Sequence, residues 1–349
     1  MKTKLVYVLT CGEEGTYIEQ ALISAYSARY HNPDAHIVLL VDDKTNELLV
    51  GKRAEVLEYV TEKVVVELPE DMQMRERSRY IKTSVRKLVE GDYLFIDTDT
   101  IICRSLDDVE HLGCAVGAVP DSHLHVNEYP IYLVSHMKSR LAMIGVKLED
   151  IDSYFSSGVL YVRDTFSAHE LYKKWYDYWF NGLENGFIGD QPYLLKADVD
   201  MGHVITEIPG TWNTVMYAYP TWIPSAYILH FSAHENMNFL FDNHFLKLIK
   251  ENGISEYKDM IIHHEWTYIA NIWQRPICSF KNMLKGFQLI NKHCPASLPT
   301  YLIKANRKDI VTELVKKDCY CLASLGIYYL DVWYRVKRWG KSIIKKILK

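Results

Sequence analysis

Two aspartates separated by one residue follow a short apolar segment near residue 100. Residues 93–96 are apolar and rich in strand-forming side chains, and they run directly into Asp97, Thr98 and Asp99. If the chain turns here, both carboxylates can face one point. Carboxylate oxygens suit Mg²⁺ or Mn²⁺, which keep open positions for the oxygens of a nucleotide diphosphate. The spacing therefore indicates a divalent-metal site, with a solvated turn at the end of a strand as the alternative.

The segments before this pair alternate between strand and helix patterns. Four apolar runs rich in β-forming residues predict strands: residues 5–10, 36–41, 64–68 and 93–96. The stretches between them have a helical pattern: residues 17–30, 47–60 and 77–90. Because each strand is apolar throughout, we expect a parallel sheet covered by helices on both faces. In such doubly wound, nucleotide-binding sheets the functional side chains gather at the carboxyl ends of the strands.

After residue 100 the patterns become irregular. Further elements are predicted as strands at residues 115–119, 159–162, 204–208 and 227–231, and as a helix at 169–180. This mixture predicts an α+β second half built onto the same sheet, followed by a helical region from about residue 239. We find no signal peptide and no apolar run long enough to span a membrane, and the seven scattered cysteines are typical of a cytosolic protein.

Four segments occur in an order that is similar to a known family. They are Phe95–Ile102 with the preceding Arg77–Thr83, then Tyr154–Val162, Gly189–Pro192 and Ile228–Phe231. Together these segments resemble glycosyltransferase family 8 and similar GT-A enzymes, a group that includes bacterial lipopolysaccharide galactosyl- and glucosyltransferases and glycogenin. The resemblance spans residues 5–231, about two thirds of the chain. It implies an α/β GT-A fold of the Rossmann-like, nucleotide-diphospho-sugar transferase type and retaining transfer from a UDP-sugar.

The resemblance also implies roles for individual side chains. Asp97, Asp99 and His230 match the three residues that hold Mn²⁺ or Mg²⁺ in the family. A neutral imidazole is a suitable third ligand, whereas a core histidine near a strand end is the alternative. Asp190 and Gln191 match the pair beside the transferred sugar. The alternative for Asp190 is an N-cap position, because Pro192 suits a first helical turn.

Further residues match positions that contact the donor nucleotide. Thr10 ends the first strand, and Gly12 would let the backbone approach a ligand closely. Arg79 and Lys82 have the i,i+3 spacing that places both on one face of a helix, where they match contacts to the donor diphosphate or sugar. Thr98 lies between the two metal-binding aspartates. A solvated basic helix face is the alternative for Arg79 and Lys82.

Two features depart from the family pattern. Ser156 stands where the family has Asn, so a contact made by that amide would be shortened or lost. The Lys-Pro-Trp that follows the late histidine in the family is also missing after His230. Between these segments Trp212 and Asn213 could border the sugar pocket, with core packing as the main alternative for Trp212.

The charge is unevenly distributed along the chain. The net charge of −4 excludes a generally basic nucleic-acid binder. Residues 326–349 hold seven Lys and Arg and one Asp, a net +6, so the other 325 residues carry −10. On a helical wheel Trp333 and Trp339 lie with aliphatic residues on one side, and the cations lie opposite. This pattern predicts an amphipathic helix in an anionic membrane surface, with a helix packed on the domain as the alternative.

These observations predict three regions. Residues 1–238 form the GT-A catalytic domain, residues 239–325 a helical region on the acceptor side, and residues 326–349 the membrane-associating tail. The predicted function is metal-dependent transfer of a sugar from a nucleotide-sugar to a saccharide or glycolipid acceptor, at the cytoplasmic face of the membrane. One alternative is a membrane-surface binding protein with a degenerate sugar-nucleotide fold. Another is a phosphohydrolase of the haloacid dehalogenase type, in which Leu194 would occupy the position of a required Asp.

Overall fold

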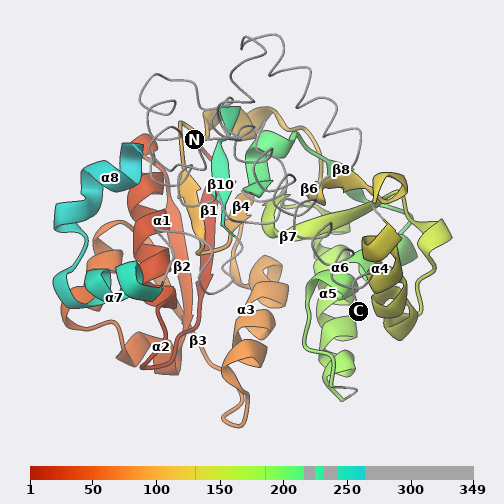
Figure 1. The fold of residues 1–349 in the computed structure, drawn as a ribbon, viewed down its shortest axis with the longest axis horizontal. Coiled ribbons are helices and arrows are strands. Elements are labelled where there is room, and N and C mark those ends of the chain that lie inside the picture. Colours follow the sequence, from red (N-terminus) through yellow and green to blue (C-terminus); the bar gives the residue numbers. More distant parts are fainter. Residues whose placement is uncertain (130, 185, 216–224, 232–242, 264–349) are drawn as a thin grey trace, which may run out of the picture.

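Continuous apolar runs form the central strands, as the sequence predicts. The computed structural model describes residues 1–129, 131–184, 186–215, 225–231 and 243–263 (Figure 1). The first four strands are β1 (Lys4–Leu9), β2 (Ile37–Asp42), β3 (Glu62–Val66) and β4 (Tyr93–Ile96). Every residue of β2 and β4 is buried. Burial on both faces explains why these strands have no alternation of polar and apolar residues.

The central sheet has seven strands in the order β3-β2-β1-β4-β7-β6-β8. The pairs β1–β2, β2–β3 and β1–β4 are parallel, as predicted for the first half. The second half adds β6 (Val116–His125), β7 (Ser153–Val162) and β8 (Ile205–Glu207), and β7 runs antiparallel to both β4 and β6. The strand order reverses between β1 and β4, which is the switch point where such sheets bind ligands.

A second, three-stranded sheet lies beside the end of β4. It contains β5 (Thr100–Ile102), β10 (Ile228–His230) and β9 (Thr214–Val215), in the order β5-β10-β9. Strand β10 pairs antiparallel with β5, and His230 lies opposite Thr100. The amide of Phe231 also donates a hydrogen bond to the carbonyl of Asp99 at 2.9 Å. These pairings bring His230, at the end of β10, next to Asp97 and Asp99.

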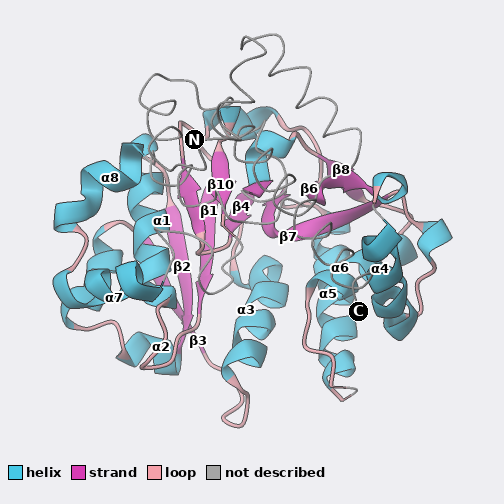
Figure 2. Cartoon of the chain, in the orientation of Figure 1, coloured by secondary structure: helices cyan, strands magenta, loops and turns pink. Residues whose placement is uncertain are grey.

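Helices cover both faces of the central sheet (Figure 2). They are α1 (Tyr17–His31), α2 (Asp43–Glu47), α3 (Met74–Leu88), α4 (Ile131–Ile144), α5 (Phe166–Leu183), α6 (Gln191–Asp200), α7 (Asn243–Asn252) and α8 (Lys258–His263). One apolar cluster joins α1, α7 and α8 to the side of β1 that carries Tyr7. The other joins α3, α5 and α6 to the side that carries Val6 and Val8. The predicted α/β class is thereby confirmed, with the parallel-dominated sheet expected of a GT-A domain.

The structure differs from the predicted elements in several places. In place of the helix predicted for residues 47–60, α2 ends at Glu47 and a 3₁₀ helix covers Gly51–Glu58, where Gly51 adopts a φ of +57°. Strand β3 begins at the exposed Glu62 and not at Val64. Helix α4 and the short strands β5 and β9 were not predicted.

The C-terminal predictions are tested only in part. Helices α7 and α8 lie in the region predicted to be helical, whereas residues 264–349, including the basic tail, lie outside the described residues. Within the described part of the chain, none of the helices is both long and apolar enough to cross a bilayer.

A buried ion pair connects the end of β2 to α3. The guanidinium of Arg77 bonds to Asp42 and, at 2.6 Å, to Asp43, and Arg77 and Asp42 are 3% and 2% exposed. Asp42 also accepts a hydrogen bond from the amide of Thr45 at 2.8 Å. The pair holds α3 against the strand ends, and α3 carries the basic side chains of the site described below.

We expect Arg77→Met to lower the free energy of unfolding by roughly 3–5 kcal/mol, because it leaves the buried Asp42 carboxylate without its cation. Urea denaturation measures the effect. Lys87→Met, an exposed change on the same helix, is the control and should alter stability by less than about 0.5 kcal/mol. Equal denaturation midpoints for the two variants would contradict the assignment.

Candidate active site

A cleft opens at the carboxyl ends of β1 and β4, where the strand order reverses. Most of the polar side chains singled out in the sequence line it. The lining residues are Val8, Leu9, Thr10, Tyr17, Gln20, Met74, Arg75, Ser78, Arg79, Lys82, Asp97, Thr98 and Asp99. They come from β1, α1, α3 and the turn after β4. This is the place at which a doubly wound sheet is expected to bind its ligand.

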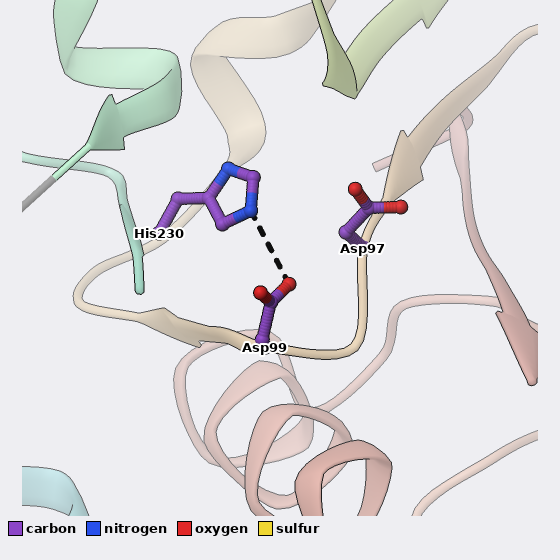
Figure 3. Close-up of side chains that lie close together, drawn as sticks. All are labelled: Asp97, Asp99 and His230. Atoms are coloured by element: carbon purple, nitrogen blue, oxygen red, sulfur yellow. Dashed lines mark ion pairs between the residues drawn. The ribbon is translucent and has the colours of Figure 1, made fainter. Parts of the chain in front are cut away.

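Asp97 and Asp99, which line this cleft, form a cluster with His230 (Figure 3). One possible ligand atom from each residue lies within 4.8 Å of the others. Nε2 of His230 is 3.2 Å from Oδ1 of Asp99. The two aspartates lie in a turn rather than along a straight strand, and the hydroxyl of Thr100 donates to the carbonyl of Asp97 at 2.9 Å. Two carboxylates and an imidazole fit Mn²⁺ or Mg²⁺ and leave positions for other oxygen ligands.

Two members of the cluster, Asp97 and His230, hold their protons more tightly than isolated side chains do. Burial raises the pKa of Asp97, and the neighbouring Asp99 carboxylate adds to this, while Lys82 and His230 partly offset it. Burial acts to lower the pKa of His230, but the Asp99 and Asp97 carboxylates outweigh it and the net shift is upward. A divalent cation binding here must therefore displace protons.

Lys82 and Arg79 link the cluster to a second carboxylate, Asp190. Nζ of Lys82 lies 3.1 Å from Oδ1 of Asp97 and 3.4 Å from Oδ2 of Asp190. Nε of Arg79 lies 3.3 Å from Oδ1 of Asp190. Arg79 and Lys82 thus share one face of α3, as their spacing predicts, but Lys82 is 6% exposed and does not lie on a solvated helix face.

Asp190 stays ionised although it is buried. Burial opposes its charge, but Lys82, Arg79 and a 2.9 Å hydrogen bond from the Ser157 hydroxyl lower the pKa of Asp190 to about 2. Asp190 occupies the N-cap position of α6, yet its side chain makes no capping hydrogen bond. Its carbonyl instead accepts the indole N–H of Trp175 at 2.9 Å. The N-cap alternative is therefore right about the position and wrong about the side chain.

Gln191, the first residue of α6, lies next to this carboxylate. Its Oε1 is 3.5 Å from the amide nitrogen of Ser157. Both Gln191 and Asp190 therefore meet β7 at Ser157, which brings the predicted sugar-side pair to the strand that lies beside β4.

The residues predicted at the end of β1 lie as follows. Thr10 lines the cleft, and its hydroxyl donates to the carbonyl of Met74 at 3.4 Å. Thr98 also lines the cleft. Gly12 is not among the lining residues, and a Cβ there would meet only Sδ of Met74 at 3.8 Å. The protein itself therefore does not require glycine at this position, and a close approach of ligand to Gly12 stays a prediction.

Sequence reasoning missed three features of the site. A Cβ on Gly158 would lie 2.3 Å from Cε1 of His230 and 3.0 Å from Oδ2 of Asp97, so only glycine fits. Asn213, considered as a border of the sugar pocket, lies fully buried behind His230. Gln20 of α1 lines the cleft and is 5% exposed, and its Oε1 has no partner among the described residues. On a helix wheel Gln20 resembles any polar residue, so the sequence offers no signal for it.

We expect Gly158→Ala to reduce Mn²⁺ affinity at least roughly tenfold, because the added methyl group displaces His230 or Asp97. Isothermal titration calorimetry measures the affinity. Gly189→Ala is the matched control, since a Cβ there meets Phe187 at an ordinary 3.5 Å. Unchanged Mn²⁺ binding by the Gly158 variant would mean that these residues do not hold the ion.

We expect Mn²⁺ affinity to fall as the pH is lowered from about 8 to about 5.5, because protons compete for His230. The Asp99 and Asp97 carboxylates raise the pKa of His230, so the loss should begin above the ordinary histidine value of 6.5. Asp190, with a pKa of about 2, stays ionised throughout and should not contribute. Titration by electron paramagnetic resonance of free Mn²⁺ tests this, and a pH-independent affinity would refute it.

No family model and no curated protein matches the chain. Several solved glycosyltransferase structures are similar to it. The galactosyltransferase LgtC in complex with donor and acceptor sugar analogues is 13% identical with a TM-score of 0.47, covering 74% of this chain and 99% of that one. Mouse xyloside xylosyltransferase 1 in its apo form is 11% identical with a TM-score of 0.44, and the match covers 67% of this chain and 98% of the xylosyltransferase. The glycosyltransferase GlyE of Streptococcus pneumoniae TIGR4 is 18% identical with a TM-score of 0.46, and the match covers 80% of this chain and 66% of GlyE. At these values the likeness is distant, and the function of this chain has to be inferred from its own residues.

Proposed function

We propose that the chain is a metal-dependent glycosyltransferase that moves a hexose from a UDP-sugar, with retention, to a saccharide or lipid-linked acceptor. The observation that supports this best is that the proposed metal ligands and a second, ionised carboxylate lie in one site. Lys82 connects the Asp97, Asp99 and His230 cluster to the ionised Asp190. The proposed metal ligands beside the two basic side chains, Arg79 and Lys82, suit binding of a diphosphate. The ionised Asp190, which contacts Lys82, suits binding of the sugar.

The charges of the site suit departure of a nucleoside diphosphate. A divalent cation held by Asp97, Asp99 and His230 would neutralise charge developing on the leaving diphosphate. Arg79 and Lys82 supply N–H donors from the α3 side of the same cleft. Charge-assisted hydrogen bonds from such donors stabilise phosphate oxygens.

Asp190 and Gln191 serve the sugar side of the proposed reaction. An ionised carboxylate only accepts hydrogen bonds, so Asp190 can hold sugar hydroxyls or stabilise positive charge at the reacting carbon. Asp190 also has the chemistry of a nucleophile, and departure on the front face of the sugar without a covalent intermediate is the other route to retention. Gln191 adds an amide beside it.

The phosphohydrolase alternative gains no support from the site. Leu194, at the position where that class requires an Asp, is 1% exposed and packs in the apolar core. The degenerate binding protein is disfavoured because the carboxylates, the imidazole and the two cations have kept a mutual geometry that binding of membranes does not need.

We expect Asp97→Asn and Asp99→Asn to reduce Mn²⁺-dependent transfer or hydrolysis of a UDP-sugar by roughly 100-fold or more, because each removes a charged metal ligand. A panel of nucleotide-sugars, assayed for release of the nucleoside diphosphate, identifies the donor at the same time. Asp34→Asn is the control, because Asp34 is exposed and does not line the cleft. Full activity of either site variant in the presence of EDTA would rule out the metal-dependent mechanism.

We further propose that residues 326–349 hold the enzyme at an anionic membrane on the cytoplasmic side, near a lipid-linked acceptor. Each of the seven cations contributes on the order of 1 kcal/mol at such a surface. Flotation with vesicles that contain anionic lipid compares the full chain with one that ends at Ser324. Loss of binding in the shorter chain is expected, and equal binding would contradict the proposal.

A further inference from the structure

We propose that Asn213 is a positioning residue that fixes the ring and the tautomer of His230, and that Ser156 holds Asn213 in the orientation this requires. The inference rests on the proposed metal site. It assigns a role to two buried polar residues that do not line the cleft.

Asn213 contacts the side of the imidazole that faces away from the aspartates. Its Oδ1 lies 2.9 Å from Nδ1 of His230, whereas Nε2 lies 3.2 Å from Oδ1 of Asp99. Each ring nitrogen therefore has its own partner, and Asn213 is 0% exposed. A buried amide would not be retained at this depth without hydrogen-bond partners, because leaving it unpaired is costly.

Ser156 contacts the end of the Asn213 amide that faces away from the histidine. The hydroxyl oxygen of Ser156 accepts hydrogen bonds from Nδ2 of Asn213 at 3.0 Å and from the amide of Gly158 at 3.3 Å. The amide nitrogen of Asn213 thus points to β7 and its oxygen points to His230. The serine that departs from the family pattern therefore contacts Asn213.

The backbone around Asn213 is held by separate contacts. Asn213 ends the 3₁₀ helix Gly210–Asn213 and precedes β9, which pairs in parallel with β10. Nε2 of His123 accepts the amide N–H of Val215 at 3.1 Å. Burial lowers the pKa of His123 to about 4, so this acceptor stays neutral at physiological pH. Asn213, directly before β9, and His230 on β10 are therefore brought together by the pairing of these two strands.

The contact with Asn213 affects which ring nitrogen of His230 can bind a metal ion. The Asp99 carboxylate, which faces Nε2, favours a proton on that nitrogen, whereas the Oδ1 of the Asn213 amide can only accept a hydrogen bond and so favours the neutral ring with its proton on Nδ1. The lone pair is then on Nε2, the nitrogen that faces Asp99 and the proposed ion. Such outer contacts fix the ring of a metal-binding histidine, and their loss typically costs 10–100-fold in metal affinity.

The test compares Mn²⁺ binding by calorimetry and the state of His230 by ¹⁵N nuclear magnetic resonance. Asn213→Ala should weaken Mn²⁺ binding by roughly 10–100-fold. In the metal-free protein, at a pH where the His230 ring is neutral, it should also shift the ring from the Nδ1–H tautomer towards the Nε2–H tautomer, whose proton faces Asp99. Asn213→Asp keeps the acceptor oxygen and should retain most of the affinity and the Nδ1–H form. Asn252→Ala, an exposed asparagine at the end of α7, is the control and should leave both readouts unchanged.

The outcomes separate this inference from the proposed function. If His230→Ala binds Mn²⁺ as tightly as the unaltered chain, the proposed metal site is wrong. If His230 is needed but Asn213→Ala keeps both affinity and tautomer, only the positioning role is wrong. Should Asn213→Ala fail to fold, Ser156→Ala decides: a smaller loss of affinity with mixed tautomers supports the role, and an unchanged protein overturns it.

Discussion

The site is organised around one buried ammonium group placed between two carboxylates. Lys82 is 6% exposed and lies within 3.4 Å of both Asp97 and Asp190. Burying any of these charges alone would be costly, and their proximity is what makes the arrangement stable. Because Lys82 is on α3, the position of that helix decides whether Asp190 and the cluster of Asp97, Asp99 and His230 form one site. The buried ion pair between Arg77 of that helix and Asp42 at the end of β2 serves this placement.

The second constraint is the small sheet formed by β5, β10 and β9. It closes the turn after β4, so that the two aspartates converge instead of pointing along a strand. It also brings His230 next to Asp99 across more than a hundred residues of sequence. Gly158 on β7 leaves the space that the imidazole and Asp97 occupy. The cluster is therefore held by four separate parts of the chain, which is the kind of rigid support that a preorganised site needs.

The outer contacts of the cluster include Ser156, which stands where the family that the chain resembles has Asn. Its hydroxyl bonds to Asn213 and to the backbone of Gly158. The polar residues of this region thus form layers: the carboxylates and imidazole of the cluster, an amide behind the imidazole, and a hydroxyl behind the amide. Variation in the outer layer can tune the inner one without touching a ligand.

The amino-acid sequence by itself determined the α/β class, the first four strands and the Asp97–Asp99 pair, because strand burial produces apolar runs and carboxylates at a strand end are a local pattern. Asp190 and His230 became candidates through the resemblance to a known family. Only the tertiary structure decided which of these side chains meet. The pairing of β10 with β5, the reach of Lys82 to two carboxylates, and the contact of Asn213 with His230 join residues that are far apart in the chain. Such contacts depend on register and packing between elements, and a single sequence carries no local signal for either.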